Sequence, residues 1–121
     1  MLESLGNQTL LPDAIYLNVP YTNKRTGEAY VIPTFLDNWP RLIINRFETD
    51  YGSLSKLVPV LTKETDPDTI IITVDDDRLY KPQTISYLAW HSEHDSNIAW
   101  GLSGWSFMWY DLPRGLFIGY I

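Results

Sequence analysis

The sequence has no cysteine among its 121 residues. A disulfide scaffold, a thiolate metal site and a cysteine nucleophile are therefore excluded. Basic residues are also few, since 9 lysines and arginines stand against 15 aspartates and glutamates, for a formal net charge of −6. Proteins that bind a phosphate backbone normally carry a basic patch, so this balance argues against a nucleic acid partner.

Long hydrophobic runs are missing too. The chain opens with neither the basic stretch nor the apolar stretch of a secretory signal. Its most apolar part, residues 97–121, is interrupted by Asp111, Pro113 and Arg114, whereas a membrane span needs about 20 nearly uncharged apolar residues. We therefore expect a cytoplasmic protein without a membrane span.

Apolar residues make up 45% of the chain and aromatic residues 14%, which is typical of a chain that folds around a core. Three short β-branched runs, at residues 14–19, 41–47 and 69–74, predict strands. The third is almost continuously apolar, as in a strand covered on both faces of a parallel sheet. We expect a single α/β domain over residues 1–121.

Helical patterns lie beside these runs. Residues 4–8 are typical of the end of a helix. Residues 53–61 place apolar side chains at positions 54, 57, 58 and 61, the spacing of one buried helix face, although Pro59 should bend or shorten this helix. Pro82 suits the first turn of a further helix that runs to about His94.

The most specific feature is an acidic triplet, Asp75-Asp76-Asp77, placed directly after the third expected strand. Ligands of open α/β sheets bind beyond the carboxyl ends of the strands. In extended backbone Asp75 and Asp77 point the same way, so the two can share one Mg²⁺ or Mn²⁺, cations that also bridge diphosphate oxygens. The alternative is a solvated acidic turn.

The residues around the triplet resemble a known family. Residues 50–61, followed by residues 66–77 with the triplet, are similar to GT-A-type glycosyltransferases, and more narrowly to sugar transferases of microbes and large algal viruses. Residues 7–13 and 15–20 upstream, and the Trp-Gly-Leu-Ser-Gly-Trp segment at 100–105, fit the same family. The resemblance covers most of the chain.

The resemblance implies a metal-dependent transferase that moves a sugar from a nucleotide-diphosphate donor to a sugar or glycan acceptor. It implies Mn²⁺ or Mg²⁺, a Lewis acid for the departing diphosphate, with Asp77 as the main metal ligand and Asp75 beside the metal or the donor ribose. Trp105 would lie on the acceptor side. The family's viral members would act in the host cytoplasm. The residues implied to contact the donor are Lys56, Asp75, Asp76 and Arg78.

Several of these residues also have a purely structural interpretation. Lys56 can be one of the many solvated lysines of a protein surface, and Arg78 can pair with its acidic neighbours. Trp105 belongs to an aromatic group that is equally typical of a core. His91 and His94 share a helix face, but without an evident third ligand a solvated face is favoured over a zinc site.

The chain departs from the family at both ends. Family members begin with a central strand whose loop helps to hold the nucleoside, and Met1 falls inside the helix that follows it. They also continue beyond the position of Ile121 into the half that supplies acceptor contacts and, in inverting members, the general base. We therefore expect a partial GT-A domain, truncated at both ends, whose residues do not include the general base.

The competing function is a non-catalytic remnant, or a metal- and nucleotide-binding module that needs another polypeptide for activity. An open sheet edge would also allow a homo-oligomer. A haloacid-dehalogenase-type phosphatase, which also uses Asp-x-Asp at a strand end, does not fit, because Leu79 stands where that motif has Thr or Val. A serine hydrolase lacks support, since no Gly-x-Ser-x-Gly occurs.

Overall fold

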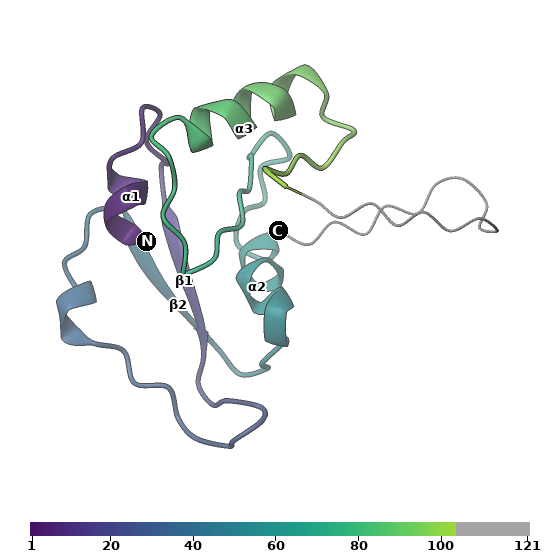
Figure 1. Ribbon diagram of the computed structural model, residues 1–121. Coiled ribbons are helices and arrows are strands. Elements are labelled where there is room, and N and C mark those ends of the chain that lie inside the picture. The colour runs from purple at the N-terminus through teal and green to yellow at the C-terminus, as the bar shows by residue number, and fades with distance from the viewer. Residues whose placement is uncertain (104–121) are drawn as a thin grey trace, which may run out of the picture.

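The computed structural model describes residues 1–103 (Figure 1). The described residues form several short helices and a small parallel sheet of two strands, a mixture that is compatible with the α/β class. In chain order the elements are α1 (Leu2–Gly6), β1 (Ile15–Pro20), the 3-10 turn η1 (Thr34–Leu36), β2 (Leu42–Phe47), the 3-10 turn η2 (Gly52–Lys56), α2 (Val58–Leu61) and α3 (Thr84–His94).

The first two predicted strands are confirmed as β1 and β2. They pair in parallel over their full length, with Ile15 opposite Leu42 and Pro20 opposite Phe47. A long connection joins them, as parallel pairing requires, because the chain must return to the starting end of the sheet. It ends at Arg41, which has a φ of 61° and whose carbonyl accepts the N–H of Ile15 at 2.9 Å.

The predicted strand at residues 69–74 is wrong. Within residues 1–103 the sheet contains β1 and β2 alone, and Figure 1 draws residues 69–75 as an irregular trace rather than an arrow. The N–H of Thr69 bonds to the carbonyl of Asp66, and the N–H of Asp75 bonds to the Tyr80 hydroxyl. An apolar run shows that a segment is able to pair, but a strand forms only where another backbone lies alongside it.

The predicted buried face of the helix at residues 53–61 is also wrong, although Pro59 shortens that helix as expected. Leu54 and Leu61 are 58% and 55% exposed, while Pro59 and Val60 are buried. The reason is a change of period, because η2 turns every three residues and α2 every 3.6. A spacing counted for one continuous α-helix therefore assigns the wrong side chains to the core.

The predicted helix after Pro82 is confirmed as α3, and the N-terminal segment packs against its start. The Gln8 side chain, 6% exposed, donates to the carbonyls of Ser4 and Lys81, both at 2.8 Å, and accepts the N–H of Ile85 at 3.0 Å. One buried amide thus joins α1 to α3 across most of the described chain. Few apolar side chains are buried among the described residues, and none is completely enclosed: besides Pro20 and Pro59, they are Leu5, Leu36, Val60, Ile85 and Ala89.

No helix among the described residues has the length and apolar character that crossing a membrane requires.

Candidate functional site

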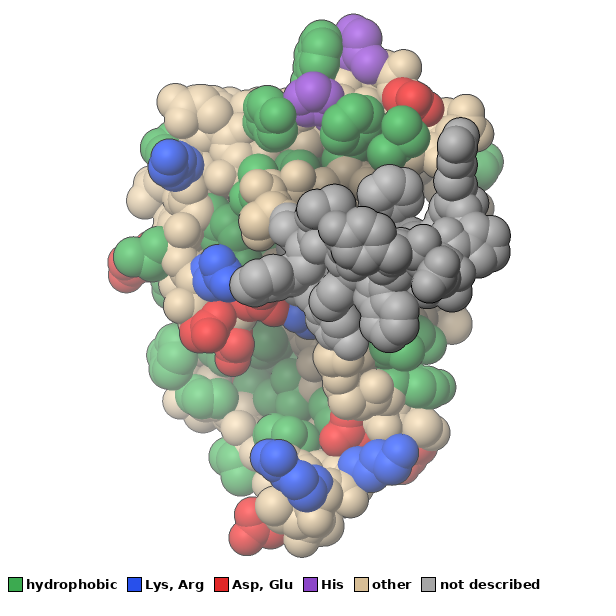
Figure 2. Space-filling view, turned by 45° about the vertical axis from the view of Figure 1, so that its right-hand side comes forward, with side chains coloured by type: hydrophobic (Ala, Val, Ile, Leu, Met, Phe, Trp, Pro, Cys, Tyr) green, Lys and Arg blue, Asp and Glu red, His purple; other side chains and the backbone are tan. Residues whose placement is uncertain are grey.

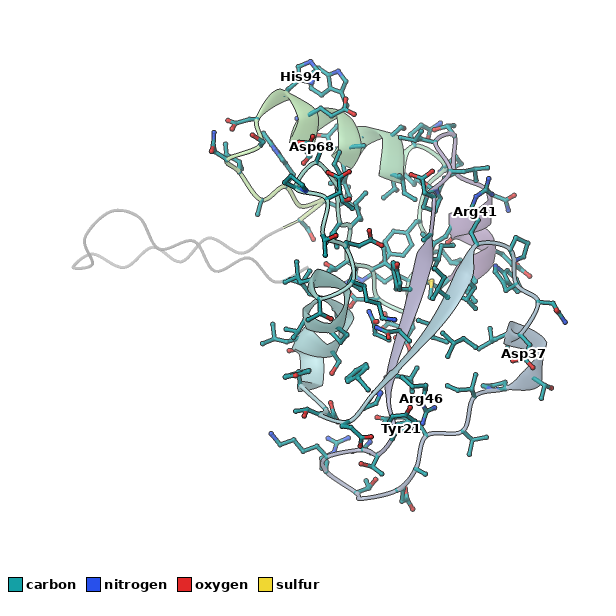
Figure 3. All side chains as sticks on the ribbon, turned by 180° about the vertical axis from the view of Figure 1, so that it is seen from behind. Tyr21, Asp37, Arg41, Arg46, Asp68 and His94 are labelled. Carbon is teal, nitrogen blue, oxygen red and sulfur yellow. The ribbon has the colours of Figure 1, made fainter. Side chains whose placement is uncertain are left out.

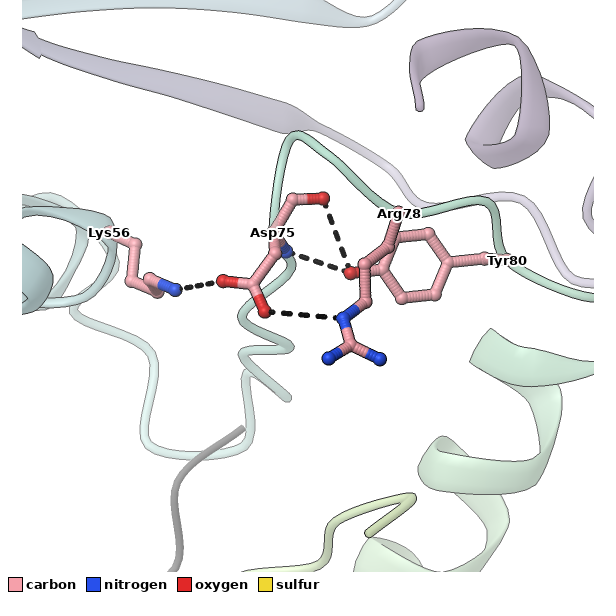
Figure 4. Close-up of polar contacts among 4 residues, drawn as sticks. All are labelled: Lys56, Asp75, Arg78 and Tyr80. Atoms are coloured by element: carbon pink, nitrogen blue, oxygen red, sulfur yellow. Dashed lines mark hydrogen bonds and ion pairs between the residues drawn. The ribbon is translucent and has the colours of Figure 1, made fainter.

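Asp75 is the centre of a charged cluster (Figure 4). One of its carboxylate oxygens forms an ion pair with the Lys56 ammonium, and the other lies 3.9 Å from the Arg78 Nε. The Lys56 and Asp75 side chains are 34% and 26% exposed, and Arg78 is 69% exposed. The structure therefore brings together three of the residues that the sequence singled out, and water still reaches each of them.

Tyr80 holds the backbone of Asp75. Its hydroxyl accepts the Asp75 N–H at 2.7 Å and lies 3.3 Å from the Asp75 carbonyl, to which it donates. The Tyr80 N–H in turn donates to the Ser4 Oγ at 3.2 Å, which ties this turn to α1. The acidic triplet thus begins at a residue whose amide and carbonyl are both fixed. Sequence reasoning missed Tyr80, since a tyrosine after an acidic turn carries no distinctive signal.

Lys56 is positioned by a pair of asparagines that cross the sheet. Asn45 of β2, 5% exposed, donates to the Asn18 Oδ1 of β1 at 2.8 Å, and Asn18 donates to the Lys56 carbonyl at 3.1 Å. The two asparagines stand opposite each other in the parallel register. Sequence reasoning missed both, although an asparagine at the fifth position of each of the first two apolar runs was a usable signal, because buried amides need partners.

The turn before η2 is organised by Asp50, which accepts the backbone N–H of Lys24 at 3.0 Å and that of Gly52 at 2.8 Å. These two hydrogen bonds, the Lys24 bond first, hold the pKa of Asp50 below its ordinary 3.8. The Ser55 hydroxyl also lies 3.3 Å from the carboxylate and accepts the Tyr51 N–H at 3.0 Å. This network fixes the start of η2, whose last residue is Lys56.

The other two carboxylates of the triplet behave differently from Asp75. Asp76 and Asp77 are exposed, and neither side chain has a hydrogen-bond or ion-pair partner within the described residues. The described part of the chain holds no group of three histidine or acidic side chains that could ligate a metal. Both Asp75 oxygens lie beside cations, so the carboxylates available to a metal ion at this turn are those of Asp76 and Asp77.

A Mg²⁺ or Mn²⁺ ion at this turn would be bound by exposed carboxylates. Mg²⁺ in proteins keeps several waters and takes one or two carboxylates together with substrate phosphates. Exposed Asp77 would supply such a carboxylate, with Asp76 next to it in the chain. Asp75 joins this set only by giving up Lys56 or Arg78, so the expected sharing of one cation by Asp75 and Asp77 stays a prediction.

The remaining candidates lie apart from this cluster. Figure 2 shows both histidines beside hydrophobic side chains at the top of the molecule. The His91 ring lies 4.4 Å from that of Tyr87, the His94 ring lies 3.9 Å from that of Trp90, and the His94 Nδ1 is 2.7 Å from the Trp90 carbonyl. Aromatic packing thus accounts for this pair. Trp105 lies outside the described residues.

Comparison of the chain with protein-family models, with curated proteins and with solved structures found no match.

Proposed function

We propose that this chain is the donor-binding part of a metal-dependent glycosyltransferase with a GT-A-type fold, which transfers a sugar from a nucleotide-diphosphate donor. The observation that carries the proposal is the cluster of Lys56, Asp75 and Arg78, with the exposed carboxylates of Asp76 and Asp77 between Asp75 and Arg78 in the chain. Cations for a diphosphate and carboxylates for a divalent ion are the two requirements of such a donor.

Lys56 and Arg78 supply the positive charge for the diphosphate. In the free chain both cations face the Asp75 carboxylate, which balances their positive charge until a diphosphate binds. A bound donor would offer its phosphate oxygens to the two cations in place of Asp75, whose carboxylate would then be free for the metal or the ribose. Asp77 would hold the divalent ion, which would neutralise charge on the departing diphosphate.

The fold supports the same proposal through its parallel pair of strands. Parallel strands occur almost only in layered α/β domains, and the acidic triplet follows an apolar segment, residues 69–74, that is able to join a larger sheet.

The second candidate is a non-catalytic module that binds metal and nucleotide and needs another polypeptide for activity. It is favoured by the small sheet, since within the described residues only β1 and β2 pair and β1 is half-buried over most of its length. A partner that supplied further strands would complete both the sheet and the chemistry.

Calorimetry of the full chain with UDP and GDP, with and without Mn²⁺, tests the metal site. We expect binding that requires Mn²⁺, is lost in Asp77→Ala and is retained in the control Asp68→Ala, which removes an exposed carboxylate outside the cluster. If Asp77→Ala binds the nucleotide with Mn²⁺ as well as Asp68→Ala does, the triplet is only a solvated turn. Release or transfer of sugar from a nucleotide sugar by the wild type then selects the enzyme, and tight binding without turnover selects the module.

A further inference from the structure

A cavity of about 410 Å³ lies at the amino ends of β1 and β2. This volume is within the range of small-molecule pockets. Residues of α1 form part of its wall, and residues 39–41, which lead into β2, form another part. Figure 3 shows Arg41 at this end of the sheet. The cavity is separate from the acidic triplet, because no lining residue belongs to residues 75–78.

Most of the lining is apolar. Leu5 is buried beneath α1 and Ile15 begins β1, so the lining is continuous with the small core. The apolar lining residues are Leu5, Leu11, Pro12, Ile15, Trp39 and Pro40. A ligand that gains from burial here must therefore have an apolar body.

Two opposite charges line the same cavity, Glu3 from α1 and Arg41 from the segment before β2. Within residues 1–103 the two do not pair with each other, and neither side chain has another ion-pair or hydrogen-bond partner. No contact in that part of the chain thus holds either charged group away from the cavity. The Asn7 amide and the Trp39 indole N–H, which belong to further lining residues, also have no partner there.

Arg41 is fixed through its backbone. Its φ of 61° lies in the left-handed region, which costs energy for any residue with a side chain. The Arg41 carbonyl accepts the Ile15 N–H at 2.9 Å, so the start of the sheet maintains this conformation. An unfavourable backbone conformation at an unpaired charged residue is typical of ligand sites.

We propose that this cavity binds a free α-amino acid with a large apolar side chain. Glu3 takes the ammonium group, Arg41 takes the carboxylate, and the apolar lining takes the side chain. Each charge of such a zwitterion meets an unpaired charge of opposite sign. A simple anion would be repelled by Glu3 and a simple cation by Arg41.

Titration of the full chain with L-phenylalanine, followed by calorimetry and NMR, tests the proposal. Three related compounds each lack one part of the ligand: 3-phenylpropionate has no ammonium group, 2-phenylethylamine no carboxylate and L-alanine no ring. Each should bind more weakly than phenylalanine, by about fivefold or more. Absence of phenylalanine binding, or equal affinity for the three phenyl compounds, would overturn the site.

Two variants assign the charges. Arg41→Gln should weaken the binding of phenylalanine but not that of 2-phenylethylamine, which has no carboxylate to lose. Glu3→Gln should weaken the binding of phenylalanine but not that of 3-phenylpropionate. Arg25→Gln is the matched control, because it removes an exposed arginine outside the cavity and should bind phenylalanine as the wild type does. Equal weakening of both compounds in either variant would overturn the role given to that charge.

A neighbouring pair of leucines tests the apolar lining. Leu10 and Leu11 are similarly exposed, but Leu11 lines the cavity and Leu10 does not. Leu11→Ala should therefore weaken the binding of all three phenyl compounds, and Leu10→Ala should leave it unchanged. The same affinity in both variants would contradict binding in this cavity.

Arg41→Gly separates binding from folding, because glycine adopts a positive φ without penalty. Its urea midpoint should match or exceed that of the wild type, while its affinity for phenylalanine should fall. Phenylalanine binding that is unchanged in this variant would overturn the role of the guanidinium.

Two variants keep this site distinct from the proposed donor site. Arg41→Gln should leave Mn²⁺-dependent UDP binding unchanged, and Asp77→Ala should leave phenylalanine binding unchanged. Loss of both ligands in either variant would show that they share one site and would overturn the inference.

Discussion

At the scale of single residues, Asp75 has two separate roles. Its carboxylate balances Lys56 and Arg78, while its backbone amide and carbonyl are held by the Tyr80 hydroxyl. The first role is electrostatic and partly exposed to water. The second is structural, because it fixes the backbone of the turn, so different substitutions separate the two roles.

We expect Asp75→Asn to lower the free energy of unfolding by about 0.5 kcal/mol, because partly exposed ion pairs contribute little. Tyr80→Phe should cost more, about 1–2 kcal/mol, since it leaves the Asp75 N–H without its acceptor. Urea unfolding measures both, with Asp76→Asn as the control that removes an exposed carboxylate. A larger loss in Asp75→Asn than in Tyr80→Phe would contradict this division.

Asp50 makes the stability of the fold depend on pH. Its pKa is held below 3.8 by the backbone N–H groups of Lys24 and Gly52, so the folded state favours the carboxylate more than the unfolded state does. This stabilisation is present above the unfolded pKa of 3.8 and is lost as the pH falls through the lower folded value.

The urea midpoint of the wild type should therefore exceed that of Asp50→Ala near neutral pH. We expect the two midpoints to converge as the pH falls from about 6 to about 2.5, because protonation removes the contribution of the carboxylate. Asp13→Ala, which changes an exposed carboxylate elsewhere, is the control. A gap that stays constant with pH would contradict the assignment.

At the scale of the elements, the asparagine pair links the sheet to the candidate site. Asn45 lies in β2, Asn18 lies in β1, and Lys56, whose carbonyl accepts from Asn18, is the last residue of η2. Each hydrogen bond joins one element to the next, so the position of Lys56 depends on the register of two strands. Such a polar chain is stabilising only when every member has its partner.

We expect Asn45→Ala to cost about 1–3 kcal/mol in unfolding free energy, because it leaves the Asn18 Oδ1 without its donor in a half-buried position. It should also weaken Mn²⁺-dependent nucleotide binding through Lys56. The control Asn38→Ala removes an exposed amide and should change stability by less than about 0.5 kcal/mol. Urea unfolding and calorimetry measure the two effects, and an unchanged affinity in Asn45→Ala would contradict the coupling.

At the scale of the whole molecule, the β1 edge of the sheet has no partner strand within residues 1–103. The Ile15 N–H bonds to the Arg41 carbonyl and the Tyr21 N–H bonds to the Phe47 carbonyl. Alternate amides of β1 therefore point away from β2, at Tyr16 and Asn18, where no acceptor lies within residues 1–103. A free strand edge of this kind is a template for another strand.

We accordingly expect the chain to form dimers as its concentration rises, with a second copy paired at the β1 edge. Sedimentation velocity over a hundredfold concentration range measures this association. Amide hydrogen exchange provides the control, because the Tyr16 and Asn18 amides should gain protection in the dimer while those of α3 do not. A single monomeric species at every concentration would contradict the prediction.

The sequence by itself determined features that depend on neighbouring residues. The runs that became β1 and β2, the helix that follows Pro82 and the shortening of the helix at Pro59 are all visible in local spacing. So is the acidic triplet. Local spacing works here because backbone preference and apolar periodicity are set within a few residues of the chain.

Only the tertiary structure decided which groups meet. Three features depend on chain segments that lie far apart in sequence: the pairing of Lys56 with Asp75, the asparagine bridge behind it, and the lack of a strand at residues 69–74 within the described part of the chain. Periodicity carries no information about such a partner, because a hydrogen bond or ion pair forms only where the fold places a second group within reach. The positions of the charged residues were therefore legible in the sequence, and their contacts were not.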